Sequence, residues 1–138
     1  MKNKNIDIAT LILRVTLGTI FIAHGLLKVM VFTLPGTVQF FDSVGFPGWM
    51  AYVVTLAEIS GGIALIAGIY VRQVAYAMIP ILVGAFYVHS GNGWLFTNQN
   101  GGWEYPLFLL IVTYVQAQLG AGKYVLSWPQ QQTSTTTA

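Results

Sequence analysis

The sequence contains no cysteine and few charged residues: among 138 residues, six are Lys or Arg and four are Asp or Glu. Without cysteine, the chain cannot form a disulfide relay, bind a metal through thiolates or use a covalent thiol in catalysis. The basic residues are spread along the chain with no basic run that could follow a nucleic-acid backbone, so we expect no nucleic-acid partner. Any redox role therefore requires a bound cofactor, quinone or metal.

Apolar residues dominate the composition. The chain is 55% hydrophobic and 7% charged, with a mean hydropathy of +0.67, whereas an ordinary soluble domain carries roughly 25% charged residues. Four apolar segments cover residues 8–32, 49–70, 74–90 and 105–119. Crossing ~30 Å of hydrocarbon takes about 20 helical residues, so the first two segments are ample and the last two are short. We predict an all-α transmembrane four-helix bundle in residues 1–128, followed by a disordered tail in residues 129–138.

The basic residues near the segment ends predict the topology. Lys2 and Lys4 precede the first segment, Arg72 separates the second from the third, and Lys123 follows the fourth, whereas Lys28 lies toward the opposite face. By the positive-inside rule, both termini face the cytoplasm. The first segment is longer than the apolar core of about 7 to 15 residues in a signal peptide, so we expect a retained helix.

The connection between the first two segments also carries a helical pattern. Phe40, Phe41 and Val44 recur at helical spacing between prolines and glycines. This pattern predicts a short interfacial helix lying over the bundle in the first outer loop. Within the third segment, Pro80 removes a backbone donor and is expected to kink the helix.

Six ionisable side chains lie inside or at the ends of the apolar segments: Arg14, His24, Lys28, Glu58, His89 and Glu104. A charge at the bilayer centre costs about 2.5 to 3.5 kcal/mol on insertion scales, so intramembrane ionisable groups usually have a task. At 1.5 Å per residue, His24 and His89 both lie roughly 25 Å from the inner boundary, with Glu58 somewhat deeper. Lys28 and Glu104 lie at the outer lip. We therefore predict a polar pocket in the outer half of the bundle.

Each of these side chains allows more than one role. Glu58 is either a proton-accepting or cofactor-orienting carboxylate, or a structural partner of Arg14. Arg14 and Lys28 suit structural anchoring, Arg14 by reaching inward or by pairing with Glu58. The two histidines could ligate a metal or haem, hydrogen-bond a quinone or another small ligand, or be structural. Glu104 is expected to cap the fourth helix, where a carboxylate complements the helix dipole, and secondarily to line the pocket.

Several motifs in order along the chain resemble the DoxX family of small bacterial membrane proteins. They are Arg14, Gly18, Phe21, His24, Gly25 and Lys28 in the first helix, Gly45-Phe46-Pro47 after the first outer loop, Glu58-x-x-Gly61-Gly62, Leu65-x-x-Gly68-x-x-x-Arg72, His89-x-x-Asn92-Gly93, Gly101-Gly102-x-Glu104-Tyr105, and Gly120-x-Gly122-x-Tyr124. The resemblance extends through Trp128. The aspartate of the family's closing Ser-x-Asp is absent, because Ser127 is followed by Trp128 and Pro129.

The resemblance implies a multi-pass protein of the bacterial cytoplasmic membrane. Some relatives are linked to thiosulfate:quinone oxidoreduction or to membrane oxidoreductase complexes. We do not extend the thiosulfate activity to this chain, where only Lys28 and Arg14 could recognise that dianion. The leading hypothesis is a subunit of a redox or redox-protective system that binds a quinone, or less readily haem, in the polar pocket. Glu58 and His24 would handle protons, His89 would hydrogen-bond the ligand, and Arg14 with Lys28 would set the local potential. The alternative is a non-enzymatic partner, assembly subunit or small oligomeric carrier with structural ion pairs.

Overall fold

The computed structural model describes residues 3–126, and within this range all regular secondary structure is helical. The helices are α1 (Lys4–Met30), α2 (Leu34–Ser43), α3 (Met50–Ala67), α4 (Val71–His89) and α5 (Glu104–Leu119), with a short 3-10 helix at Ser90–Asn92. The predicted all-α fold is confirmed for the described residues. The tail predicted at residues 129–138 lies outside them.

Three of the described helices are long and apolar enough to cross a membrane: α1, α3 and α4 with its 3-10 extension. The fourth predicted span is also helical, but α5 has 16 residues and so measures about 24 Å, less than the ~30 Å of a hydrocarbon core. The predicted count of four spanning helices therefore stays a prediction. Helix α4 is continuous through Pro80, and the kink expected there stays a prediction.

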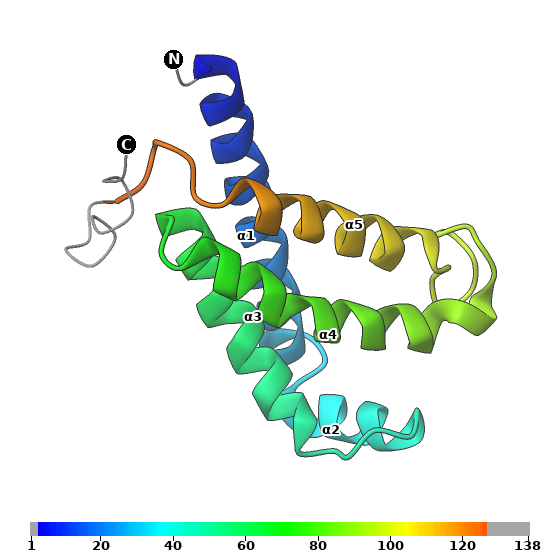
Figure 1. The fold of residues 1–138 in the computed structure, drawn as a ribbon. Helices are drawn as coiled ribbons and strands as arrows, with labels where there is room; N and C mark the ends of the chain where they lie inside the picture. The colour runs from blue at the N-terminus through cyan, green and yellow to red at the C-terminus, as the bar shows by residue number, and fades with distance from the viewer. Residues whose placement is uncertain (1–2, 127–138) are drawn as a thin grey trace.

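The helices form two antiparallel hairpins (Figure 1). Helices α1 and α3 lie side by side and are joined through α2, while α4 and α5 form the second pair. Leu126 donates its backbone N–H to the carbonyl of Ala67 at 3.0 Å, and Arg72 donates to the carbonyl of Gln118 at 3.2 Å. The start of α1, the α3–α4 turn and the segment after α5 consequently share one end of the fold. Helix α2 and the loop before α5 lie away from that end.

Local chemistry sets the helix boundaries. Asn3 caps α1 by accepting a hydrogen bond from the N–H of Asn5 at 3.0 Å. Thr33 caps α2, which has a proline in its first turn, and Gly68 ends α3 with a φ of 82° that glycine adopts without steric cost. The helix predicted within the first outer loop is therefore present as α2. Its place at the membrane surface stays a prediction.

Glycines allow α1 and α3 to approach very closely. A methyl group on Gly18 would lie 2.6 Å from the carbonyl oxygen of Gly62, and a methyl group on Gly62 would lie 2.6 Å from that of Gly18. A methyl group on Gly25 would lie 2.5 Å from the side chain of Ile59 and 3.3 Å from its backbone nitrogen. In a membrane, lipid is as apolar as the helices, so the hydrophobic effect does not drive two helices together. Small residues at the seam allow van der Waals contact between the backbones, which stabilises the pair instead. The seam also fixes the register, because each step along α1 is matched by a step back along α3.

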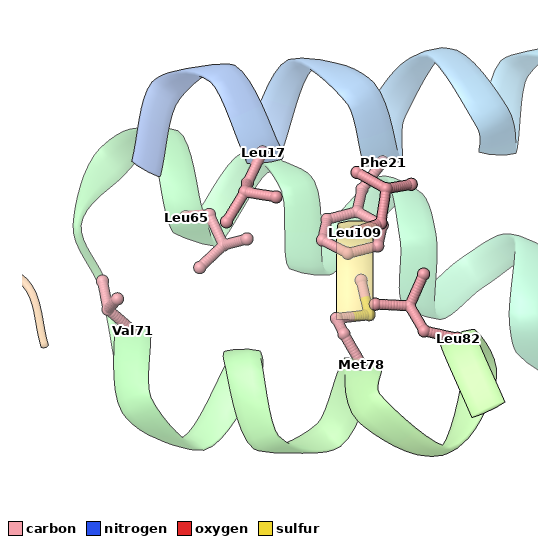
Figure 2. Close-up of a cluster of buried hydrophobic side chains, with 7 residues drawn as sticks. All are labelled: Leu17, Phe21, Leu65, Val71, Met78, Leu82 and Leu109. Atoms are coloured by element: carbon pink, nitrogen blue, oxygen red, sulfur yellow. The ribbon is translucent and has the colours of Figure 1, made fainter. Parts of the chain in front are cut away.

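The apolar core joins all four long helices at the centre of the fold. Figure 2 shows its seven members, Leu17, Phe21, Leu65, Val71, Met78, Leu82 and Leu109. Phe21, Met78, Leu82 and Leu109 gather in one group that links α1, α4 and α5. Outward residues such as Leu56, at 70% exposed, leave an apolar surface that suits lipid.

Candidate functional site

A largely buried ion pair links α1 to α3 in the half of the fold that holds α2, with Glu58 buried and Lys28 partly buried. The Lys28 ammonium lies 2.7 Å from a carboxylate oxygen of Glu58, and the two side chains are 17% and 7% exposed. Both charges are thus withdrawn from the surface and neutralise each other. Pairing of this kind is what makes ionisable residues tolerable inside a membrane segment.

The direction of side chains on antiparallel helices explains why these two residues meet. Every side chain of an α-helix leans toward the N-terminal end of its own helix. Lys28 on α1 therefore leans back into the fold, whereas Glu58 on α3 leans toward the end that holds α2. The glycine seam, in which Gly25 lies opposite Ile59, brings the side chains of Lys28 and Glu58 close enough to pair. Lys28 consequently turns inward and does not act as an outward-facing anchor.

His24 stands one helical turn before Lys28 and extends the ion pair into a cluster. Its Nδ1 lies 2.8 Å from the carbonyl of Ile20, and the Lys28 ammonium lies 3.4 Å from the carbonyl of His24 itself. Because a carbonyl only accepts, Nδ1 carries the proton, which leaves Nε2 of the neutral ring as a proton acceptor.

Two further residues contact Lys28 or His24 and were not singled out from the sequence as site residues: Tyr105, which joins the cluster, and Thr37, which lies beside it. The ring of Tyr105, in the first turn of α5, stacks on His24 with centroids 6.1 Å apart. The hydroxyl of Thr37 on α2, which is buried, lies 3.3 Å from the carbonyl of Lys28. Tyr105 lies in the Gly101-Gly102-x-Glu104-Tyr105 motif, so its position in the family pattern was an available signal. Thr37 carried no such signal.

Arg14 lies at the other end of the fold, and the hypothesis that it pairs with Glu58 is wrong. Its guanidinium donates to the carbonyl of Ala121 at 2.7 Å and to the carbonyl of Tyr124. The α1–α3 register explains the separation, because Arg14 faces Gly68 at the end of α3, far along the helix from Glu58. Arg14 thus has backbone carbonyls as its partners, which is compatible with structural anchoring. Its role as a ligand-binding residue stays a prediction.

His89 and Glu104 lie at the two ends of the loop between α4 and α5. His89 Nδ1 lies 2.7 Å from the carbonyl of Ala85, and its ring packs beside Gly101. Glu104 occupies the first turn of α5, as expected, but its carboxylate accepts a hydrogen bond from the backbone N–H of Phe96 at 3.3 Å instead of capping the helix. His24, Lys28 and Glu58 thus lie together. Within residues 3–126, neither His89 nor Glu104 makes a hydrogen bond or an ion pair with any of these three.

The cluster of Lys28, Glu58, His24 and Tyr105 offers donors and acceptors of a kind that suits a polar ligand ring. Lys28 donates, Glu58 accepts, and the free Nε2 of His24 accepts. Within residues 3–126, no group of three or more His, Asp or Glu side chains is placed to hold a metal ion. These four side chains form a polar cluster, and its available chemistry is hydrogen bonding and proton exchange.

The chain is similar to known proteins over part of its length. The family model described as DoxX matches residues 9–91, a range that includes Lys28 and Glu58 and ends just after His89. The "Putative oxidoreductase CatD" of Bacillus subtilis (strain 168) is 43% identical over 83 residues, 60% of each chain. The "Inner membrane protein YqjF" of Escherichia coli (strain K12) is 33% identical over 85 residues, 61% of this chain and 64% of its own. The matched region thus spans less than two thirds of either relative. No solved structure matches.

Proposed function

This chain belongs to the DoxX family of bacterial inner-membrane proteins, and on that premise we propose that it is the membrane component of an oxidoreductase or redox-protective system. In this proposal, the polar cluster binds the ring of a quinone. The observation that carries the proposal is the buried Lys28–Glu58 pair beside the free imidazole nitrogen of His24. The name of one relative, a putative oxidoreductase, supports the redox assignment.

The chemistry of a quinone fits these side chains. A quinone has two carbonyl oxygens that accept hydrogen bonds, and its reduced quinol has two hydroxyl groups that donate them. The Lys28 ammonium suits a quinone carbonyl, whereas Glu58 and the Nε2 of His24 suit the hydroxyl protons of a quinol. Because the chain has no cysteine, the two electrons would be exchanged with a partner oxidoreductase subunit. In this proposal, the chain supplies ligand binding and proton acceptance.

Variants of the ion pair test the proposal. Glu58→Gln leaves the partly buried Lys28 ammonium without its counter-charge, which we expect to destabilise the fold by up to about 3 kcal/mol, the low end of the range for a fully buried pair. Replacing both residues by methionine removes the two charges together and should be close to neutral for stability. The double variant should nonetheless lose quinone binding. The measurements are the quinone content of protein purified in mild detergent and the thermal shift caused by a short-chain quinone.

The control is Asp42→Asn, which changes an exposed carboxylate on α2. We expect it to leave both stability and quinone binding unchanged. If the double methionine variant folds and still binds quinone as the parent does, the proposed site is wrong. If the parent carries no quinone and shows no quinone-dependent shift, the cluster is a structural ion pair, as expected for a non-enzymatic assembly subunit or carrier.

A further inference from the structure

A second polar site lies at the opposite end of the fold, where the chain begins α1 and leaves α5. A surface cavity of about 550 Å³, open to its surroundings, lies there between Lys4 and Asp7 on the first turn of α1 and Lys123 and Tyr124 on the segment after α5. Asp7 is half-buried, and the other three residues are exposed. This volume falls in the range of ~300–1,000 Å³ that is typical of small-ligand pockets. The quinone proposal makes no use of these four residues.

The cavity is built by tertiary contacts rather than by chance proximity of two chain ends. Arg14 is 1% exposed, and its two hydrogen bonds to the carbonyls of Ala121 and Tyr124 hold both sides of Lys123 against α1. Gly122 packs on Thr10 of α1 and has a φ of 70°, a conformation that favours glycine. Lys123 is thereby directed to the same opening as Lys4, although the two residues lie at opposite ends of the described chain.

The charges around this cavity favour an anion. Lys4 and Lys123 contribute two positive charges against the single negative charge of Asp7, and the N-terminal end of α1 adds the positive end of its dipole. Lys4 and Asp7 lie in the first turn of α1, a helix long and apolar enough to cross a membrane, so in a bilayer we expect the cavity at the level of the lipid headgroups. Tyr124 is a residue type that gathers at this level. A ligand with an anionic phosphodiester and an attached lipid tail meets all of these conditions.

We propose that this cavity binds the headgroup phosphate of an anionic phospholipid, with Lys4 and Lys123 as its two cationic contacts. A basic residue near a membrane surface contributes about a factor of five in affinity for anionic lipid, so losing both lysines should weaken binding about thirty-fold. Asp7 repels the phosphate, and removing its charge should strengthen binding several-fold.

The test is native mass spectrometry of the full chain in neutral detergent, titrated with dioleoyl-phosphatidylglycerol or with dioleoyl-phosphatidylcholine. The parent should retain the anionic lipid in preference to the zwitterionic one, and millimolar inorganic phosphate should not displace it. Lys4→Gln with Lys123→Gln should lose about thirty-fold in affinity. Asp7→Asn should gain affinity, a result that a folding defect would not produce.

Arg72→Gln is the matched control, because Arg72 is a basic residue at the same end of the fold that does not line the cavity. This variant should bind the anionic lipid as the parent does. Equal losses in Arg72→Gln and in the lysine variants would overturn the site in favour of general surface charge. Unchanged binding in Asp7→Asn, equal retention of the two lipids, or displacement by inorganic phosphate would also overturn it.

Discussion

Arg14 is almost entirely buried, and its guanidinium binds backbone that follows α5. Because hydrogen bonds to charged groups contribute about 1.5–3 kcal/mol each, Arg14→Ala should release the segment around Lys123 and cost about 3 kcal/mol or more. Trypsin cleaves after lysine, so faster cleavage at Lys123 in detergent or in nanodiscs reports this release directly. Arg14→Lys should restore part of the protection, since an ammonium can reach one carbonyl.

The control for Arg14 is Arg72→Ala, which removes a single hydrogen bond from an exposed arginine. Bonds in such exposed positions contribute little, so cleavage at Lys123 should stay close to that of the parent. Equal rates in Arg14→Ala and the parent would show that the segment after α5 is held by other contacts.

His24 has a ring that packs on Tyr105 and a free Nε2. Substitution by phenylalanine distinguishes the contributions of these two features. His24→Phe keeps a ring against Tyr105 and loses both imidazole nitrogens. We expect the free energy of unfolding to change by only about 1 kcal/mol, because the carbonyl of Ile20 lies within a helix. Affinity for a short-chain quinone should fall about tenfold, as measured by thermal shift against ligand concentration. Parent-like affinity in this variant would remove His24 from the proposed site.

At the scale of helices, the pairing of α1 with α3 depends on a few glycines. Gly18→Ala and Gly62→Ala each place a methyl group within 2.6 Å of a backbone oxygen on the facing helix. Backbone cannot move aside as a flexible side chain can, so each change should destabilise the protein by about 1–3 kcal/mol. Gly84→Ala is the matched control, because a methyl group there meets only the edge of Phe46 at 3.9 Å. Thermal unfolding in one detergent compares the three.

Gly84→Ala should be neutral or should stabilise α4 by up to about 1 kcal/mol, since alanine is the better helix former. If the alanine variants of Gly18 and Gly62 unfold at the same temperature as that of Gly84, then close contact between α1 and α3 is not needed for stability.

The same helix pair shows which features of the site can be predicted from sequence. Helical spacing places Arg14 and Lys28 on one stripe of α1, and the small residues after Glu58 indicate that α3 packs tightly on another helix. The sequence therefore predicts which face of each helix is buried. The basic residue that pairs with Glu58 was not predictable, because Arg14 and Lys28 both lie on this stripe. The choice between them depends on the register between the two helices, which is a tertiary property. The register depends on which glycines face each other and on the length of the α2 connection.

Across the whole molecule, polar groups gather at the two ends and the apolar core lies between them. The sequence predicts part of this division, since it indicates a polar pocket in the outer half of the fold. It does not predict that His89 packs beside Gly101 or that Arg14 binds the chain after α5. Both contacts depend on how irregular segments fold back, and no hydrophobic periodicity reports on such segments. The partners of loop residues therefore had to come from the structure.

The shared end of the described chain predicts a pattern of chemical labelling. Gln73, at the start of α4, lies at the end that holds the start of α1, whereas Gln99 is exposed in the loop before α5. The positive-inside rule assigns the first end to the cytoplasm. Because the parent has no cysteine, single variants Gln73→Cys and Gln99→Cys can be labelled with a membrane-impermeant maleimide against an unreactive background. Gln99→Cys should react in cells whose inner membrane is intact, and Gln73→Cys only after that membrane is permeabilised. Reaction of both in intact cells would place the two positions on one side, which is incompatible with α4 as a membrane-spanning helix.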